Sequence, residues 1–93
     1  METVTIQIGN SDNKLTQAKW AELIRDVRLV LGNHCGQIHF DGGSRFDSQW
    51  QNACFVAEIY EIDKKGLLES LSRWAILYNQ DSIAVTFGTT EFI

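Results

Sequence analysis

Three short segments of the chain alternate between apolar and polar residues. They are residues 4–8 (VTIQI), residues 37–41 (QIHFD) and residues 82–87 (SIAVTF). Because successive side chains of a strand point to opposite faces of a sheet, this period of two predicts strands that are buried on one side. The predicted inward residues are Val4, Ile6, Ile8, Ile38, Phe40, Ile83, Val85 and Phe87. The predicted outward residues are Thr3, Thr5, Gln7, Gln37, His39, Asp41, Ala84 and Thr86.

The longest strand candidate is NACFVAEIYEI, residues 52–62. One side carries Ala53, Phe55, Ala57 and Ile59, and the other carries Cys54, Val56, Glu58 and Tyr60. Both sides are largely apolar at the start of the segment. This pattern is typical of a central strand that is covered on both faces there.

Two other segments follow the period of a helix. In residues 16–31 apolar side chains recur at i, i+3, i+4 and i+7, which predicts a helix with one buried stripe. Thr16 is the predicted N-cap of this helix, and Gly32 is its predicted left-handed stop. A second helix is predicted over residues 64–78, with Asp63 as the N-cap and Asn79 as the left-handed cap.

The predicted order of elements is strand, helix, strand, strand, helix, strand. With right-handed crossovers, two such halves form a four-stranded antiparallel sheet with both helices on one face. This is the ferredoxin-like βαββαβ arrangement, in the α+β class. The chain of 93 residues contains no proline, repeat or linker that would divide it, so we expect a single domain, residues 1–93.

The predicted fold leaves one face of the sheet without helices. The outward residues on it are a mixture of polar side chains with Cys54, Val56, Tyr60 and Ala84. A symmetric dimer covers such a face with a single self-complementary patch. We therefore expect a homodimer through the sheet; a solvated face, or cover by the 42–51 loop or by another partner, are the alternatives.

Composition limits the functional classes. The net charge is −4, and no basic cluster is present of the kind that duplex nucleic acid binding needs. No apolar run approaches the ~20 residues of a membrane helix, and no signal peptide is recognisable, so we expect a cytoplasmic protein. Cys35 and Cys54 show no metal-binding spacing with His34 or His39. We expect no metal and no cofactor.

One group of residues suggests acid–base chemistry. His39 and either Glu58 or Asp41 are expected to be neighbours across a hairpin, and a carboxylate beside an imidazole favours a general acid or base. The structural alternative is an ordinary cross-strand pair. Cys54 is a candidate nucleophile only if His39 lies near it; otherwise it is a buried, inert cysteine.

The segment between the middle strands suggests binding. DGGSRF, residues 41–46, combines two glycines with Arg45, which is suited to an anion, although a long flexible hairpin tip is the simpler explanation. Trp50 lies off every apolar stripe, so it either folds back onto the sheet or acts as a binding anchor. Gln51 and Asn52 accompany it. Gln80, at the corner after the second helix, has no evident turn-forming role.

Three segments of the chain resemble short sequence segments in a set of short uncharacterised bacterial and phage proteins. They are WQNACF (50–55), YNQDSIA (78–84) and TTEFI (89–93). The resemblance covers the C-terminal half of the chain. It implies a shared α+β fold and carries no assigned activity. It also implies that Trp50, Gln51, Asn52, Gln80, Asp81 and Ser82 belong together.

The leading hypothesis is a non-enzymatic binding protein that uses the open sheet face and the 42–52 loop. The predicted contact residues are Trp50, Gln51, Asn52, Arg45, Gln80 and Tyr60. An accessory or counter-defence factor of a phage or mobile element, with a host protein or a small nucleotide-like ligand as partner, is one form of it. The alternatives are a small dimeric enzyme with His39 as acid or base, and a purely structural subunit.

Overall fold

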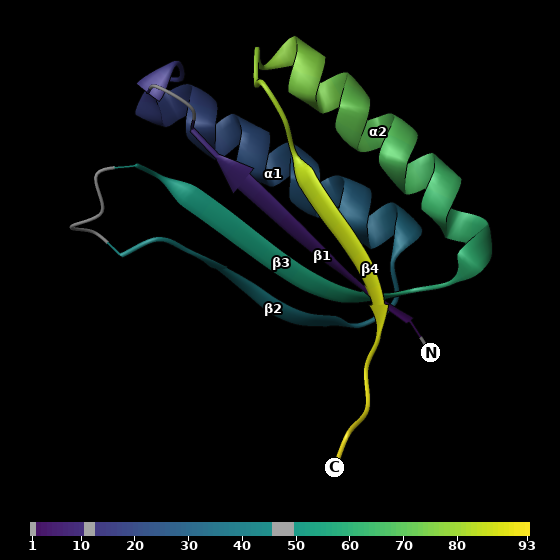
Figure 1. The fold of residues 1–93 in the computed structure, drawn as a ribbon. Coiled ribbons are helices and arrows are strands. Elements are labelled where there is room, and N and C mark those ends of the chain that lie inside the picture. Colours follow the sequence, from purple (N-terminus) through teal and green to yellow (C-terminus); the bar gives the residue numbers. More distant parts are fainter. Residues whose placement is uncertain (1, 11–12, 46–49) are drawn as a thin grey trace.

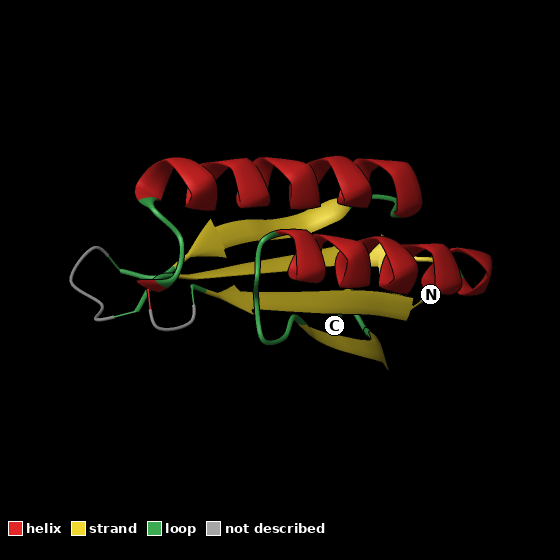
Figure 2. Cartoon of the chain, turned by 90° about the horizontal axis from the view of Figure 1, so that it is seen from above, coloured by secondary structure: helices red, strands yellow, loops and turns green. Residues whose placement is uncertain are grey.

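The computed structural model describes residues 2–10, 13–45 and 50–93. The elements in chain order are β1 (Glu2–Gly9), α1 (Gln17–His34), β2 (Ile38–Gly43), β3 (Asn52–Ile59), the 3₁₀ turn η2 (Glu61–Asp63), α2 (Lys64–Leu77) and β4 (Ala84–Thr89). The strands form one antiparallel sheet in the order β2-β3-β1-β4 (Figure 1). The two helices lie side by side on one face of this sheet (Figure 2). The predicted ferredoxin-like arrangement is confirmed.

The core fills the space between the helices and the covered face of the sheet. Its buried apolar residues are Val4, Ile6, Ile8, Leu23, Ile24, Val27, Val30, Leu31, Ala53, Phe55, Ala57, Ile59, Leu67 and Leu71. The strand residues in this set are the ones that alternation placed inward on β1 and β3. Burying large apolar side chains contributes about 1.5–3 kcal/mol each, so this layer supplies most of the stability of the fold.

The helix ends differ in part from the prediction. The Thr16 side chain accepts a hydrogen bond from the Lys19 backbone N–H at 3.2 Å, which confirms the N-cap of α1. Gly32 does not stop α1: the helix continues to His34, and Cys35 ends it in an extended conformation. Asn79 takes the left-handed conformation with φ of 53°, as expected.

The start of α2 also differs from the prediction. Asp63 makes no side-chain capping bond, because the chain enters α2 through η2 instead of an extended N-cap. β3 therefore ends at Ile59, earlier than the predicted residue 62, and the Asp63 N–H donates to the Tyr60 carbonyl at 2.9 Å.

A bulge in β2 changes which side chains share a face. Ile38 pairs with Ala57, but the register then shifts, so that Phe40 pairs with Val56 and Asp41 with Phe55. The prediction that Ile38 and Phe40 point the same way is therefore wrong, and so is the placement of Asp41 on the open face. One inserted residue moves every later side chain of the strand to the other face.

Candidate interaction surface on the open sheet face

The sheet face opposite the helices exposes several large apolar side chains. Phe40 is 52% exposed, and its ring lies over Gly42, where an added Cβ would come within 2.5 Å of the ring. Val56 and Cys54, in the neighbouring strand, are half-buried. Tyr60, which continues the alternation past the end of β3, is 67% exposed. Apolar side chains gathered on one face are typical of surfaces that associate.

The C-terminal segment crosses one end of this face. The Thr90 hydroxyl shares a hydrogen bond of 2.8 Å with the hydroxyl of Thr3 in β1. The Phe92 ring lies 5.8 Å from the His39 ring, centroid to centroid, yet Phe92 remains 72% exposed. Figure 1 shows the last residues leaving β4 and continuing past the sheet, away from the helices. The segment therefore raises an aromatic side chain above the face at this end.

The opposite end of the face contains a hollow of about 460 Å³. The described residues that line it are Gln7, Ile8, Gly9, Phe40, Gly43, Ser44, Asn52, Ala53 and Cys54. Ser44 and Asn52 close its outer side, since the Ser44 N–H donates to the Asn52 carbonyl at 2.9 Å and the Asn52 N–H donates to the Ser44 hydroxyl at 3.1 Å. The hollow thus has an aromatic wall in Phe40, a thiol in Cys54 and a polar rim.

The structure brings together two of the three candidate acid–base residues. His39 Nε2 lies 3.4 Å from Glu58 Oε1, with each side chain about a quarter exposed (26% and 23%). Asp41 lies on the other face and takes no part. Neither His39 nor Glu58 is among the residues that line the hollow. This arrangement fits the cross-strand pair that was the structural alternative.

Asp41 has a different partner, on α1. Its carboxylate accepts hydrogen bonds from Arg28 Nε at 2.7 Å and Arg28 Nη2 at 2.9 Å. These bonds, opposed in part by desolvation, lower the pKa of Asp41. The pair joins the outer strand of the sheet to the helix layer.

Cys54 has no imidazole within reach. Its neighbour in β2 is Gly42, whereas His39 lies beside Glu58, four residues further along β3, which is about 13 Å at the usual rise of a strand. The other thiol, Cys35, has its pKa raised to about 11, mainly by burial and also by the charge of Asp63. A thiol in this state is a poor nucleophile at neutral pH.

The loop residues predicted to bind have divided roles. Gln51 is engaged within the fold: it exchanges two amide hydrogen bonds with Gln17, at 2.8 and 3.0 Å, and accepts one from the buried Asn10 at 3.2 Å. The Asn52 amide donates to the Trp50 carbonyl at 3.1 Å, which holds the turn. Trp50 is 45% exposed, and its role in binding stays a prediction.

The predicted contact residues Arg45 and Gln80 lie in different parts of the fold. Arg45 ends the described part of the loop, and the predicted loop residues 46–49 lie outside the described residues. Gln80 is 8% exposed and lies between α2 and β4, so it does not contribute to the open face.

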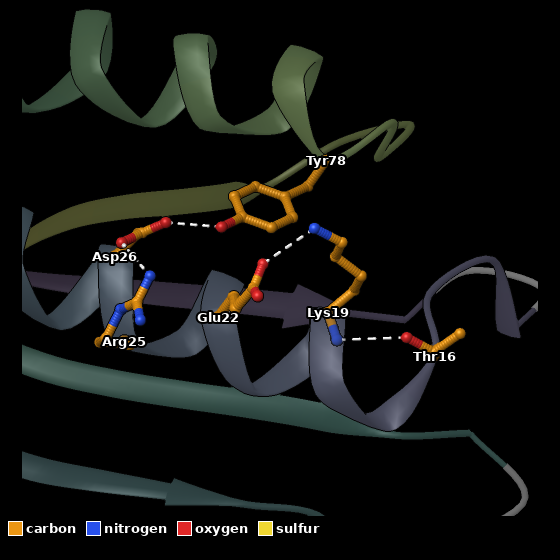
Figure 3. Close-up of polar contacts among 6 residues, drawn as sticks. All are labelled: Thr16, Lys19, Glu22, Arg25, Asp26 and Tyr78. Carbon is orange, nitrogen blue, oxygen red and sulfur yellow. Dashed lines mark hydrogen bonds and ion pairs between the residues drawn. The ribbon is translucent and has the colours of Figure 1, made fainter.

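Sequence reasoning missed the polar contact between the helices that Figure 3 shows. The Tyr78 hydroxyl donates to Asp26 Oδ2 at 2.5 Å, and Arg25 Nη2 lies 3.4 Å from Asp26 Oδ1. The bond to Asp26 raises the pKa of Tyr78 to about 12. The available signal was the position of Asp26 on the apolar stripe of α1, where a charge needs a partner. The contact serves helix packing.

Two features are absent from the described part of the chain. Within residues 2–10, 13–45 and 50–93, no group of three or more His, Cys, Asp or Glu side chains is arranged to hold a metal ion. No helix in this part of the chain has the length and apolar character needed to cross a membrane.

Comparison with known proteins supports the fold. No protein-family model and no curated protein matches the sequence. Among solved structures, the de novo designed protein Foldit4 is similar, with a TM-score of 0.69, 13% identity, and coverage of 97% of this chain and 98% of that one. A dimeric ferredoxin-like protein of unknown function from Thermobifida fusca YX has a TM-score of 0.65, 7% identity, and coverage of 97% and 92%. At these identities the likeness concerns the fold alone.

Proposed function

We propose that this protein is a non-enzymatic interaction module that pairs with a second copy through the open face of its sheet. The observation that carries the proposal is the exposure of Phe40, Phe92 and Tyr60 on one side of the molecule. The core of the single chain is formed without these rings, so their exposure to water adds nothing to its stability. Burying them against a partner contributes about 25 cal/mol for each Å² of apolar surface.

The two ends of the face are complementary to each other. One end carries the raised ring of Phe92, and the other contains the hollow beside Phe40 and Cys54. A two-fold axis that runs across the strands reverses the ends of the second copy. Phe92 of each copy then faces the hollow of the other, which is the self-complementarity that a symmetric dimer requires.

The fold is compatible with this mode of association. The similar structure from Thermobifida fusca YX is described as dimeric. Four strands of about six residues give roughly 400 Å² of flat area. Each partner contributes about 800 Å² to a standard interface, which is more than this flat area. The dimer therefore also needs the additional area that the protruding rings and the hollow bury. We expect a dissociation constant in the micromolar range.

The cysteines support a reducing environment. Cys35 and Cys54 are both free, and neither forms a disulfide with the other. Free thiols are the usual state in the cytoplasm. We place the protein there as part of the same proposal.

Sedimentation measurements over a wide range of protein concentration test the dimer. We expect the wild-type mass to rise from one chain toward two. Phe40→Ser and Phe92→Ser should each weaken association by at least about tenfold, because each change removes two buried rings per dimer.

The matched control is Leu29→Ser, since Leu29 is 61% exposed but lies on α1, in the helix layer. This variant should associate like the wild type. A wild-type chain that stays monomeric at every concentration would refute the proposal, as would equal association of all three variants.

A further inference from the structure

An imidazole and a carboxylate lie next to each other on the open face, at the end that carries Phe92. His39 Nε2 is 3.4 Å from Glu58 Oε1, and the two side chains are about a quarter exposed (26% and 23%). The Phe92 ring lies 5.8 Å from the imidazole, centroid to centroid. The pair is therefore already partly removed from water in the single chain, and it lies where the second copy is proposed to dock.

The bulge in β2 explains why the imidazole reaches this face. Ile38 pairs with Ala57 and Phe40 pairs with Val56, so His39 is the inserted residue. A bulge re-aims the side chain at the point where it interrupts the ladder. His39 and the next residue, Phe40, therefore both lie on the open face, where Phe40 borders the hollow.

The Glu58 carboxylate is held in place beside the imidazole. The Glu58 N–H donates to the Gln37 carbonyl at 2.9 Å, and the Gly36 N–H donates to the Glu58 carbonyl at 3.0 Å. A Cβ on Gly36 would lie 3.4 Å from Glu58 Oε2, so this oxygen lies close to the backbone there. In the described part of the chain, Glu58 has no lysine or arginine as an ion-pair partner. Protonated His39 is the cation that its charge can pair with.

The other charged groups of the surrounding elements do not contact the pair. On β2, Asp41 is bonded to Arg28 of α1, on the covered side of the sheet. On β1, the residue opposite Glu58 is Thr3, which carries no charge. In the C-terminal segment, the Glu91 side chain is exposed to solvent. The protonation of the imidazole therefore decides the net charge at this place.

Near neutral pH, histidine is the side chain that changes its charge. An imidazole ordinarily titrates near about pH 6.5, whereas phenols and thiols ionise above about pH 8 and carboxylates below about pH 5. The chain contains two histidines. The other one, His34, lies in the helix layer, with Nε2 3.5 Å from the Ser70 hydroxyl. His39 is thus the histidine that can alter the charge of the open face.

A second copy on the open face takes the pair out of water. With a neutral imidazole the pair carries one uncompensated negative charge, and desolvating such a charge is strongly unfavourable. With a protonated imidazole the two opposite charges compensate each other, and their attraction grows as water is excluded. Association through this face should therefore favour the protonated form of His39.

We infer that pH controls the dimer, because His39 of each copy takes up a proton when the second copy covers its pair with Glu58. The inference rests on the proposed function, since it concerns the same face. Each proton taken up changes the association constant by at most about tenfold per pH unit, and the dimer contains two such pairs. Uptake is partial over this range, so we expect the dissociation constant to fall by at least about tenfold from pH 8 to pH 6.

Sedimentation of the wild-type chain and three variants at pH 6, 7 and 8 tests this inference. His39→Gln should form a dimer whose dissociation constant changes by less than about twofold over this range. Glu58→Gln should reverse the dependence and associate more weakly at pH 6, because a protonated imidazole then has no carboxylate beside it. The matched control is His34→Gln, which removes the other histidine and should behave like the wild type. Thermal midpoints confirm that each variant is folded.

A second measurement needs no variant. The ring protons of His39 are followed by NMR against pH in dilute wild-type protein and at concentrations where dimers form. We expect the imidazole to stay protonated to a higher pH in the concentrated sample. Identical titration curves in the two samples, while sedimentation shows dimers, would overturn the inference.

Two further outcomes would also overturn it. One is a wild-type dimer with the same dissociation constant at pH 6 and pH 8, and the other is an equal pH dependence in His39→Gln and the wild type. A wild-type chain that stays monomeric at every pH and concentration would instead refute the proposed dimer itself. Failure of the pH control is therefore distinguishable from failure of the proposed function.

Discussion

The two faces of the sheet use the same residue type for different purposes. Phe55 in β3 points under the helices and is 1% exposed, whereas Phe40 in β2 points the other way and is 52% exposed. Phe55 belongs to the core that stabilises the single chain. Phe40 adds little to that core, and its apolar surface is available to a partner. Phe55 therefore belongs to the residues that determine the fold, and Phe40 to those that we propose determine association.

The largest difference between the faces should appear in stability. Phe55→Ala leaves a cavity in the core and should lower the free energy of unfolding by about 3–5 kcal/mol. Phe40→Ala, measured at a concentration where the chain is monomeric, should lower it by less than about 1 kcal/mol, since half of the ring is already in water. Chemical denaturation of both variants checks this, and equal losses would show that the open face is part of the monomer core.

A smaller effect on stability is expected from the hydrogen bond between Tyr78 and Asp26, a polar contact in the helix layer. Tyr78→Phe removes the hydroxyl that donates to Asp26 and should cost about 1–2 kcal/mol, toward the lower end for a bond to a charged group because the site is partly solvated. Asp26→Asn in the same background should then cost much less than it does in the wild type. Additive losses in this double-mutant cycle would show that the two groups do not interact.

The same contact should give the stability a dependence on alkaline pH. The pKa of Tyr78 is raised to about 12 from its ordinary value of 10.0. Between these values the unfolded chain loses the proton while the folded chain keeps it, so the contribution is complete below pH 10 and is lost as the pH rises toward 12. Tyr78→Phe should flatten the fall in unfolding free energy over this range. An unchanged slope would contradict the assignment.

The smallest effect is expected where the edge strand meets the helix layer. Asp41→Asn weakens the pair with Arg28 and should cost about 0.3–1 kcal/mol, because both side chains are partly exposed (33% and 54%). The pKa of Asp41 is lowered by Arg28, so this contribution is present above the ordinary carboxyl pKa and disappears as the pH falls through the lowered value. Denaturation at neutral and acidic pH measures it, and a loss that is the same at both would rule out the ion pair as its source.

The sequence predicted the fold because regular alternation and helical periodicity are local patterns. Each of them places apolar side chains on one face of an element, and the core buries that face. β1 and β3 follow their patterns without interruption, and the inward residues of each are buried. β2 does not, because a bulge depends on how the strand pairs with β3 and leaves no mark in residues 37–41. The reversal of Phe40 and Asp41 could therefore not be read from the sequence.

The candidate site was predictable only in part for the same reason. The pairing of His39 with Glu58 follows from two strands joined by a hairpin. The engagement of Gln51 by Gln17 and Asn10, and the position of Phe92 over His39, join residues far apart in the chain. Such contacts depend on the completed tertiary structure, which no local pattern specifies.

The most direct test of association through the open face is the reactivity of Cys54 as a function of protein concentration. Cys54 lines the hollow that the second copy should cover, whereas Cys35 has its pKa raised to about 11 and is replaced by serine to leave one reporting thiol. The rate of labelling by a thiol reagent at fixed pH is measured from dilute protein to concentrations well above the dissociation constant. We expect the rate to fall as the dimer forms, and to stay constant in Phe92→Ser. A rate for the otherwise wild-type chain that does not change with concentration, while sedimentation shows dimers, would contradict pairing through this face.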